Sequence, residues 1–242
     1  MGHSKPLAID LFAGLGGWTD GLLLEGWDVI GFDIERHEYG DAKYPAQLVI
    51  QDVLTLHGSQ FKDADLIVAS PPCQAYSYRA MPWKRAKALP PPDNSLFDAC
   101  FRIQREACEA AGRHIPLVVE NVRGAQKWVG RSRWNYGSFH LWGDVPALMP
   151  ITKNGEDSAG CKNAGGSWFK ISNANVPHSR GDGIKQAGIS GPRANGKGDA
   201  WFQDGAAKHG SKTNARKAAS ALIAKIPLPL SSYIARVYKP EK

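Results

Sequence analysis

The stretch LAIDLFAGLGG, residues 7–17, decides the fold class of this 242-residue chain. Its first half is an apolar run that predicts a short buried strand, and its second half is a glycine-rich turn. Residues 18–24 can then form a helix. Glycines let the backbone come close to a bound cofactor, and the start of a helix offers free N–H groups. No Gly-Lys-Ser/Thr follows, so the turn is not a phosphate-binding P-loop.

The same alternation of apolar runs and helical stretches continues over the first 125 residues. Residues 27–32, 48–50, 65–69 and 115–119 predict four further strands, and residues 95–112 predict a helix before the last of them. Continuous apolar strands separated by helices are typical of a parallel sheet that is covered on both faces. The pattern therefore predicts an α/β fold with a doubly wound, mostly parallel sheet and right-handed crossovers.

Chemically active side chains follow the predicted strands. Asp33, Asp52, Cys73 and Glu120 each stand at or just past the end of one. In such sheets ligands bind beyond the carboxyl ends of the strands. Asp33 is well placed to accept both hydroxyl groups of a ribose, and Asp52 could accept from an adenine amino group. The alternative is a packing turn followed by two solvated acids.

The segment SPPCQ, residues 70–74, comes directly after the fourth strand. Pro71 and Pro72 restrict the backbone and so orient the thiol of Cys73. A structural cysteine would more naturally lie inside the apolar run. At a strand end near helix termini, we expect a lowered thiol pKa.

Three motifs together resemble one family. The turn DLFAGLGG at 10–17, SPPCQ at 70–74 and ENV at 120–122 match, in order and spacing, the DNA (cytosine-5) methyltransferases over residues 7–125. The resemblance implies a Rossmann-like fold and the cofactor S-adenosylmethionine, with S-adenosylhomocysteine as product. It also implies double-stranded DNA as partner and methylation of carbon 5 of a flipped cytosine through a covalent adduct.

The resemblance assigns site residues. Cys73 would be the nucleophile, with Gln74 beside it, and Glu120 would bind the cytosine N3 atom. The implied cofactor contacts are Phe12 on the adenine ring, Asp33 on the ribose and Asp52 on the adenine amine, together with Asp10, Gly14, Leu15, Gly16, Gly17, Ile34, Val53 and Pro72.

The chemistry of cytosine explains why a thiol and a carboxyl group are both needed. Carbon 5 of this electron-poor ring does not attack a methyl sulfonium unaided. A thiolate on carbon 6 makes carbon 5 nucleophilic, and a carboxyl group at N3 stabilises the developing charge. Glu120 must act as an acid, so we expect its burial to raise its pKa.

The chain departs from the family at its arginine motif, Gln-x-Arg-x-Arg. The nearest run is VGRSR at 129–133, which lacks the glutamine. Arg131 is the expected catalytic arginine and Arg133 the alternate, although a phosphate contact or a solvated loop fits either one. Residues 136–143 predict a further strand that packs on the sheet.

A second departure lies near the C-terminus. The family motif Gly-Asn-x-Val-Pro corresponds here to AKIPLPL at 224–230, with Lys225 where asparagine is expected. We expect this segment to dock back onto the first domain. Residues 215–225 and 230–237 predict helices on either side of the two prolines.

The domain organisation follows from a change in composition. Residues 1–149 and 215–242 are expected to form the catalytic domain. Residues 150–214 are rich in glycine and net basic, and predict a small, irregular target-recognition lobe or a mobile insertion. This region would read DNA loosely, read a very short site or fold only on contact with DNA.

A loop rich in cations and aromatics follows the cysteine. Residues 75–87 interleave four cations with three aromatic side chains, which suits closure over flipped DNA. The alternative is a solvated basic loop whose Trp83 covers apolar surface. The expected DNA contacts are Arg79, Trp83, Lys84, Arg85 and Arg133.

The composition sets the remaining expectations. A net charge of +7 favours an anionic partner such as nucleic acid. Four cysteines without a CxxC pair predict no metal site, and most of them should be packed, reduced thiols. No signal peptide or membrane span is expected, so we expect a cytoplasmic protein. The resemblance to the DNA (cytosine-5) methyltransferases implies a bacterial or phage-encoded enzyme, which we expect to be monomeric.

Two alternative functions stay open. One is a catalytically silent DNA- or S-adenosylmethionine-binding protein, against which the intact Cys73 and Glu120 count. The other is an enzyme that methylates RNA or modifies a pyrimidine with a different one-carbon group.

Overall fold

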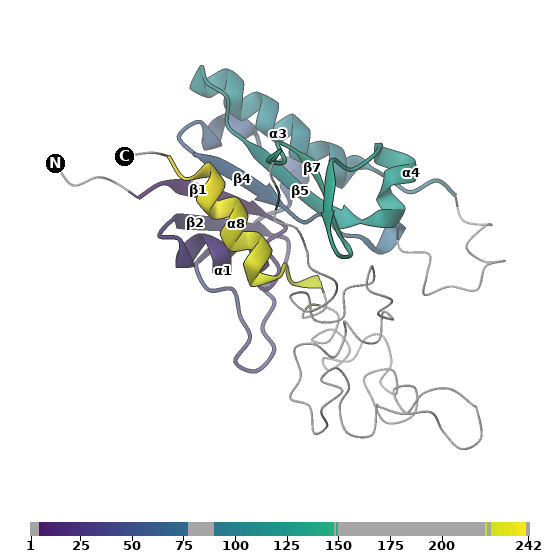
Figure 1. Cartoon of the computed structure of the whole chain (residues 1–242), viewed down its shortest axis with the longest axis horizontal. Helices are drawn as coiled ribbons and strands as arrows, with labels where there is room; N and C mark the ends of the chain where they lie inside the picture. Colours follow the sequence, from purple (N-terminus) through teal and green to yellow (C-terminus); the bar gives the residue numbers. More distant parts are fainter. Residues whose placement is uncertain (1–4, 77–89, 148, 150–220, 222–223, 241–242) are drawn as a thin grey trace. The chain divides into compact units, whose positions relative to one another are not determined.

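The computed structural model describes residues 5–76, 90–147, 149, 221 and 224–240 (Figure 1). Apart from Tyr39–Ala42 and residues 221, 224 and 225, these residues belong to one compact unit. The predictions that fall outside the described residues are the recognition lobe at 150–214, most of the helix at 215–225, and the DNA contacts Arg79, Trp83, Lys84 and Arg85. These and the domain boundaries stay predictions.

Within the described residues, seven strands form one sheet in the order β3-β2-β1-β4-β5-β7-β6. The five parallel strands are β1 (Leu7–Leu11), β2 (Asp28–Asp33), β3 (Gln47–Ile50), β4 (Leu66–Ala69) and β5 (Leu117–Val122). The antiparallel strands β6 (Trp134–Tyr136) and β7 (Phe139–Gly143) complete one side of the sheet. The predicted mostly parallel, Rossmann-like α/β sheet is confirmed.

The predicted further strand on the sheet is β7, but it covers only Phe139–Gly143, because the chain reverses just before it. Tyr136 pairs with Phe139, and Gly137 between them has a φ of 59°. A two-residue hairpin turn needs positive φ, which glycine adopts without strain. The segment therefore forms a hairpin.

Helices cover both faces of the sheet (Figure 1). One face carries α1 (Gly17–Leu24) and α8 (Leu228–Tyr238), whose buried side chains share a core with Ala8, Val68 and Val118. The other carries α3 (Ser95–Ala111), η1 (Val53–Thr55) and η2 (Gly58–Phe61), which share a core with Ile9, Ile67 and Val119. The short elements η3 (Gln74–Tyr76), η5 (Arg123–Ala125) and α4 (Gln126–Val129) follow the ends of β4 and β5. Strands whose alternate residues face two apolar layers explain the continuous apolar runs of the sequence.

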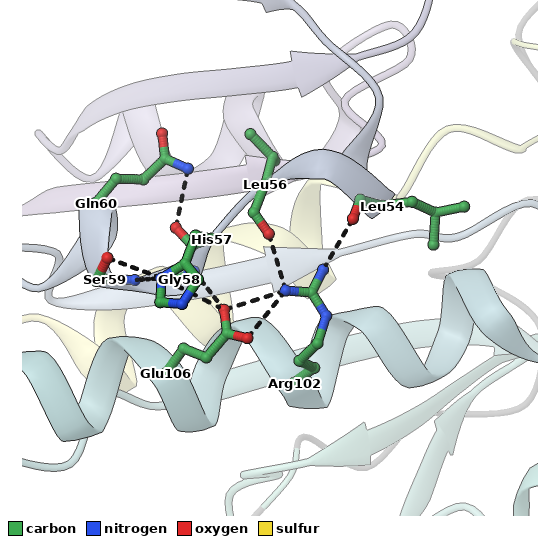
Figure 2. A network of polar contacts seen from close by, with 8 residues as sticks. All are labelled: Leu54, Leu56, His57, Gly58, Ser59, Gln60, Arg102 and Glu106. Carbon is green, nitrogen blue, oxygen red and sulfur yellow. Dashed lines mark hydrogen bonds and ion pairs between the residues drawn. The ribbon is translucent and has the colours of Figure 1, made fainter.

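A polar network ties α3 to the segment after β3 (Figure 2). The guanidinium of Arg102 donates to the carbonyls of Leu54 (3.3 Å) and Leu56 (2.9 Å) and to Glu106 at 3.1 Å. Glu106 accepts from the backbone N–H of Gly58 at 2.6 Å. That N–H, followed by Arg102, lowers the pKa of Glu106. The network fixes the η1–η2 segment on α3.

The C-terminal helix packs on α1 through glycines. A Cβ atom at Gly17 would overlap the backbone N of Ile226, and one at Gly21 would overlap the backbone of Ser231 and Ser232. The Trp27 Nε1–H donates to the carbonyl of Ala235 at 3.1 Å and adds a polar tie. The expected docking of the C-terminal segment onto the first domain is confirmed.

A buried carboxyl group lies between β1 and α1. Asp10 is 1% exposed, and its Oδ2 accepts from Thr19 Oγ1 at 2.6 Å. Burial is the largest cause that raises the pKa of Asp10 to about 8, while the Thr19 hydrogen bond lowers it. The folded protein therefore keeps a proton on Asp10 at pH values where the unfolded chain has lost it.

We expect Gly21→Ala to destabilise the protein by about 1–3 kcal/mol, because the added methyl group has no room against α8. The direction of the change in stability is informative, because replacing glycine by alanine at an open helix position stabilises a protein by about 0.5–1 kcal/mol. Urea unfolding measures the difference. Leu24→Ala, at a 65% exposed position of the same helix, is the control and should change little. A Gly21→Ala protein as stable as the wild type would contradict the packing described.

Asp10→Asn should change how stability depends on pH. Because the folded pKa of Asp10 is raised to about 8 from 3.8, its contribution to stability is complete below the unfolded value and is lost as pH rises through the folded value. The unfolding free energy of the variant should therefore gain about 3 kcal/mol on the wild type between about pH 5.5 and pH 8. Denaturant unfolding at several pH values measures this, with the exposed Asp63→Asn as control. A pH-independent difference would refute it.

Candidate active site at the carboxyl edge of the sheet

The register of the parallel strands aligns their carboxyl ends. Leu11 of β1 lies level with Phe32 of β2 and with Ala69 of β4, and Ala69 lies level with Val119 of β5. The residues one step further along the four strands are therefore neighbours at one edge: Phe12, Asp33, Ser70 and Glu120.

The glycine-rich turn after β1 has an unusual backbone. Phe12 has a φ of 59°, the one positive value for a non-glycine residue in the described part of the chain. Gly14 and Gly16 have φ values of 52° and 73°. The N–H of Gly14 donates to Asp33 Oδ2 at 2.8 Å, so the turn is bound to the end of β2. Strained backbone of this kind, which costs about 1–3 kcal/mol, is concentrated at functional sites.

Two carboxyl groups and exposed apolar side chains follow the ends of β2 and β3. Asp33 Oδ1 lies 3.3 Å from the N–H of Glu35, and Asp52 Oδ1 accepts from the N–H of Leu54 at 2.9 Å. Ile34 is 69% exposed, and Leu54 is also exposed. Exposed large apolar groups next to carboxylates offer both a flat contact and hydrogen-bond acceptors to a ligand.

The structure brings only some of the predicted cofactor residues to this edge. Leu15 and Val53 are buried, so their side chains pack in the interior. Asp10 is turned toward Thr19. The absence of a side chain at Gly17 is explained by Ile226, which leaves no space for one. Among the predicted cofactor residues, Phe12, Gly14, Asp33, Ile34 and Asp52 lie at the open end of the strands, and Pro72 is exposed in the loop after β4.

The loop that carries Cys73 is anchored where it leaves β4. The Trp18 Nε1–H donates to Ser70 Oγ at 3.0 Å, and the N–H of Ser70 donates to the carbonyl of Leu11 at 3.2 Å. The Asn121 side-chain amide donates to the carbonyl of Pro71 at 2.9 Å. Elements α1, β1 and β5 thus hold Ser70 and Pro71, the first two residues of the loop that carries the thiol.

The same loop is anchored again after the cysteine. The N–H of Tyr76 donates to the carbonyl of Cys73 at 3.0 Å, and the Tyr76 hydroxyl donates to Asn94 Oδ1 at 2.8 Å. A Cβ atom at Gly124 would overlap the carbonyl of Tyr76, so η5 approaches the loop as closely as a backbone can. Cys73 and the exposed Gln74 lie between these two sets of contacts.

The described cysteines differ in their surroundings. Cys100 is fully buried in α3, where burial raises the pKa of its thiol, as expected for a packed cysteine. Cys73 is half-buried in its loop. Glu120, one strand away, is 8% exposed at the end of β5. The sheet thus places one thiol and one carboxyl group on neighbouring strand ends.

Asn121 is a residue to which sequence reasoning gave no role. Its side chain is buried, donates to Pro71 and accepts from the N–H of Val122 at 2.8 Å. Trp18 likewise had no assigned role, and Tyr76, counted among the aromatics of the loop at 75–87, is buried and anchors that loop. The sequence signal that could have identified Asn121 is its position, as a polar residue within a motif at a strand end, next to Glu120.

The two candidate arginines, Arg131 and Arg133, flank Ser132, whose side chain forms hydrogen bonds within the protein. Ser132 donates from its N–H and its hydroxyl to Gln126 Oε1, at 3.2 and 3.1 Å, and its hydroxyl lies 2.9 Å from His140 Nδ1. Arg131 and Arg133 on either side are both exposed.

Two features are absent from the part of the chain that the structure describes. There, no three or more His, Cys, Asp or Glu side chains gather as they would around a metal ion. In the same residues, every helix is too short or too polar to cross a membrane.

Comparison with known proteins gives one family and several distant structures. The family model for C-5 cytosine-specific DNA methylases matches residues 7–128, just over half of the chain. Similar solved structures include a protein described as a DNA modification methyltransferase encoded within an E. coli prophage, with 24% identity over 52% of this chain and 34% of that one and a TM-score of 0.36. The Schizosaccharomyces pombe Dnmt2 methyltransferase has 18% identity over 51% and 36%, with a TM-score of 0.35. The Entamoeba histolytica methyltransferase EhMeth has 17% identity over 52% and 40%, with a TM-score of 0.35.

The matched part spans between about a third and two fifths of those solved chains. No curated protein matches the sequence. The family model, in contrast, runs from β1 into α4 and includes the glycine-rich turn, the Cys73 loop and Glu120. This chain belongs to the C-5 cytosine-specific DNA methylase family, a family of methyltransferases.

Proposed function

We propose that this protein transfers a methyl group from S-adenosylmethionine to carbon 5 of a flipped cytosine in double-stranded DNA, through a covalent adduct on Cys73. The observation that carries the proposal is the anchored loop that presents Cys73 beside the end of β5, where Glu120 stands. Such an enzyme acts where the DNA is, which in a bacterium or a phage-infected cell is the cytoplasm. We propose that it acts as a monomer.

The residues at the ends of β1, β2 and β3 fit S-adenosylmethionine. Asp33 and Asp52 offer carboxylate oxygens to hydroxyl and amino groups, and exposed Ile34 offers apolar contact to an adenine ring. The turn from Phe12 to Gly16 presents backbone without side chains at Gly14 and Gly16. When bound, the cofactor supplies an electrophilic methyl group.

The reaction on cytosine needs both site residues. The Cys73 thiolate forms a bond to carbon 6, the double bond between carbons 5 and 6 opens, and Glu120 protonates N3. Carbon 5 then takes the methyl group from the sulfonium, which departs as the neutral thioether, and the N3 proton returns to Glu120. A base removes the proton from carbon 5, the sulfur–carbon bond breaks, the double bond re-forms, and Cys73 leaves as thiolate. Every bond made to Cys73 is broken again, so the protein is unchanged.

The anchors of the Cys73 loop have a catalytic consequence. Attack on carbon 6 requires the sulfur to lie about 3–3.5 Å from its target along one direction. Pro71 is held through its carbonyl by Asn121, which is next to Glu120 in β5. The two reacting groups are therefore fixed to the same strand, one directly and one through a single hydrogen bond. We propose Asn121 as the residue that sets their spacing.

DNA phosphates are the proposed partners of the exposed cations. Between Glu120 and Asp144 the sequence has no acidic residue, and it contains Arg123, Lys127, Arg131 and Arg133. All four side chains are exposed. Cations next to a reaction centre neutralise phosphates and orient the duplex. Arg79, Trp83, Lys84 and Arg85 remain proposed DNA contacts from the loop after Cys73.

DNA duplexes that contain 5-fluorocytosine test the proposal. Fluorine replaces the proton that must leave carbon 5, so elimination of the cysteine is blocked and the adduct persists. With S-adenosylmethionine present, we expect a complex that survives denaturing electrophoresis. Cys73→Ser should abolish it, while Cys108→Ser, at the far end of α3, should leave it intact.

Two results would contradict the proposed methylation of DNA through Cys73. One is the absence of any adduct on DNA of mixed sequence with an adduct on RNA instead, which would mean a different nucleic acid substrate. The other is an adduct that persists in Cys73→Ser, which would place the nucleophile elsewhere.

A further inference from the structure

Tyr44 lies in the connection between β2 and β3, and its side chain is buried. Its hydroxyl group lies 2.7 Å from Thr19 Oγ1, which lies 2.6 Å from Asp10 Oδ2. The direct distance from the Tyr44 hydroxyl to Asp10 is 3.5 Å. Three buried polar groups, from β1, from α1 and from the β2–β3 connection, therefore form one chain of hydrogen bonds.

The ring of Tyr44 lies against two glycines. A Cβ atom at Gly31 of β2 would overlap the end of the ring, and one at Gly16 would lie 3.1 Å from Tyr44 Cδ2. Pro45 closes on Gly16 from the same side, since a Cβ atom there would overlap its ring. Tyr44 and Pro45 thus fill the space that side chains at these glycines would need.

Gly16 is the last residue of the turn that begins at Phe12. Its N–H donates to the carbonyl of Ala13 at 2.8 Å, and its φ of 73° makes it the left-handed start of α1. The other side of the turn is bound at Gly14 by Asp33. The turn is therefore held from two sides, by the end of β2 and by the Tyr44–Pro45 segment.

We propose that Tyr44 is a positioning residue for the cofactor: it holds Gly16, and through it the turn from Phe12, in the conformation that receives S-adenosylmethionine. The identity of the ligand rests on the proposed function. Tyr44 acts through the turn, and the hydrogen bonds from Thr19 and Asp10 hold Tyr44 in place. This gives Asp10 a supporting role under the turn instead of a direct contact.

The charges around these three linked groups are consistent with a Tyr44 hydroxyl that donates a hydrogen bond. Burial, followed by the charge of Asp10, raises the pKa of Tyr44, so its hydroxyl keeps its proton. The ionisable groups that act on Asp10 are Asp33 of β2, Tyr44 and Asp20 of α1. Above about pH 8, where Asp10 is ionised, Tyr44 donates to Thr19 and Thr19 donates to Asp10, because a carboxylate only accepts. Below that pH the protonated Asp10 can also donate, and the Thr19 hydroxyl still links Asp10 to Tyr44. Tyr44→Phe removes the first donor and keeps the ring.

The test compares Tyr44→Phe with Tyr238→Phe. The Tyr238 hydroxyl donates to the carbonyl of Asp144 at the opposite, amino edge of the sheet, so each variant loses one hydroxyl and one hydrogen bond. We expect Tyr44→Phe to weaken S-adenosylhomocysteine binding about fivefold to tenfold, as for one lost hydrogen bond, in calorimetric titration. Tyr238→Phe should bind as the wild type does. Thr19→Val, which removes the middle of the chain, should repeat the loss.

Amide hydrogen exchange of the unliganded protein supplies a readout that does not depend on the cofactor. In Tyr44→Phe, the amides of residues 13–16 should exchange faster than in Tyr238→Phe. Unchanged exchange, or faster exchange with unchanged binding, would overturn the positioning role. A wild-type protein that binds no S-adenosylhomocysteine would contradict the proposed function, and the exchange data alone would then decide whether Tyr44 holds the turn.

Discussion

Parallel pairing of β1, β4 and β5 is the constraint on which the rest of the structure depends. It brings the ends of three strands level, so the glycine-rich turn, the Cys73 loop and Glu120 follow neighbouring strands at one edge although the chain separates them widely. A shift of one residue between β4 and β5 would turn Glu120 to the other face of the sheet, because side chains alternate along a strand. The two apolar layers oppose such a shift, since it would move apolar side chains out of both.

The site itself is built from connections that cannot relax freely. Phe12 has a positive φ that costs free energy, and the hydrogen bond from Gly14 to Asp33 offsets part of it. The Cys73 loop is held before the cysteine by Asn121 and after it by Tyr76. The buried side chains of Asn121 and Tyr76 therefore serve to hold the geometry of the loop.

Much of this could be predicted from the sequence, because short apolar runs ending in polar residues indicate parallel strands whatever the details. The motifs around Cys73 and Glu120 could also be recognised, because each follows such an apolar run. The packing of Gly17 against Ile226 could not be predicted from the sequence. A glycine that leaves room for a ligand and one that leaves room for a packed segment look alike in sequence, and only the position of Ile226 distinguishes them. The direction of the Asp10 side chain depends on Thr19 and Tyr44, which no local pattern links to it. The expectation of one strand misses the β6–β7 hairpin because it counts the turn residue Gly137 as part of that strand, although a glycine at such a place is a turn signal.

The central claim concerns which atom receives the methyl group, and isotopic labelling tests it most directly. The protein is incubated with duplex DNA of mixed sequence and S-adenosylmethionine that carries a deuterated methyl group, and the DNA is digested to nucleosides for mass spectrometry. The account predicts the label in 5-methyl-2′-deoxycytidine, and its loss in Glu120→Gln. Label in an exocyclic amine, as N4-methylcytosine or N6-methyladenine, would contradict the account, because a thiol that adds to carbon 6 would then have no purpose.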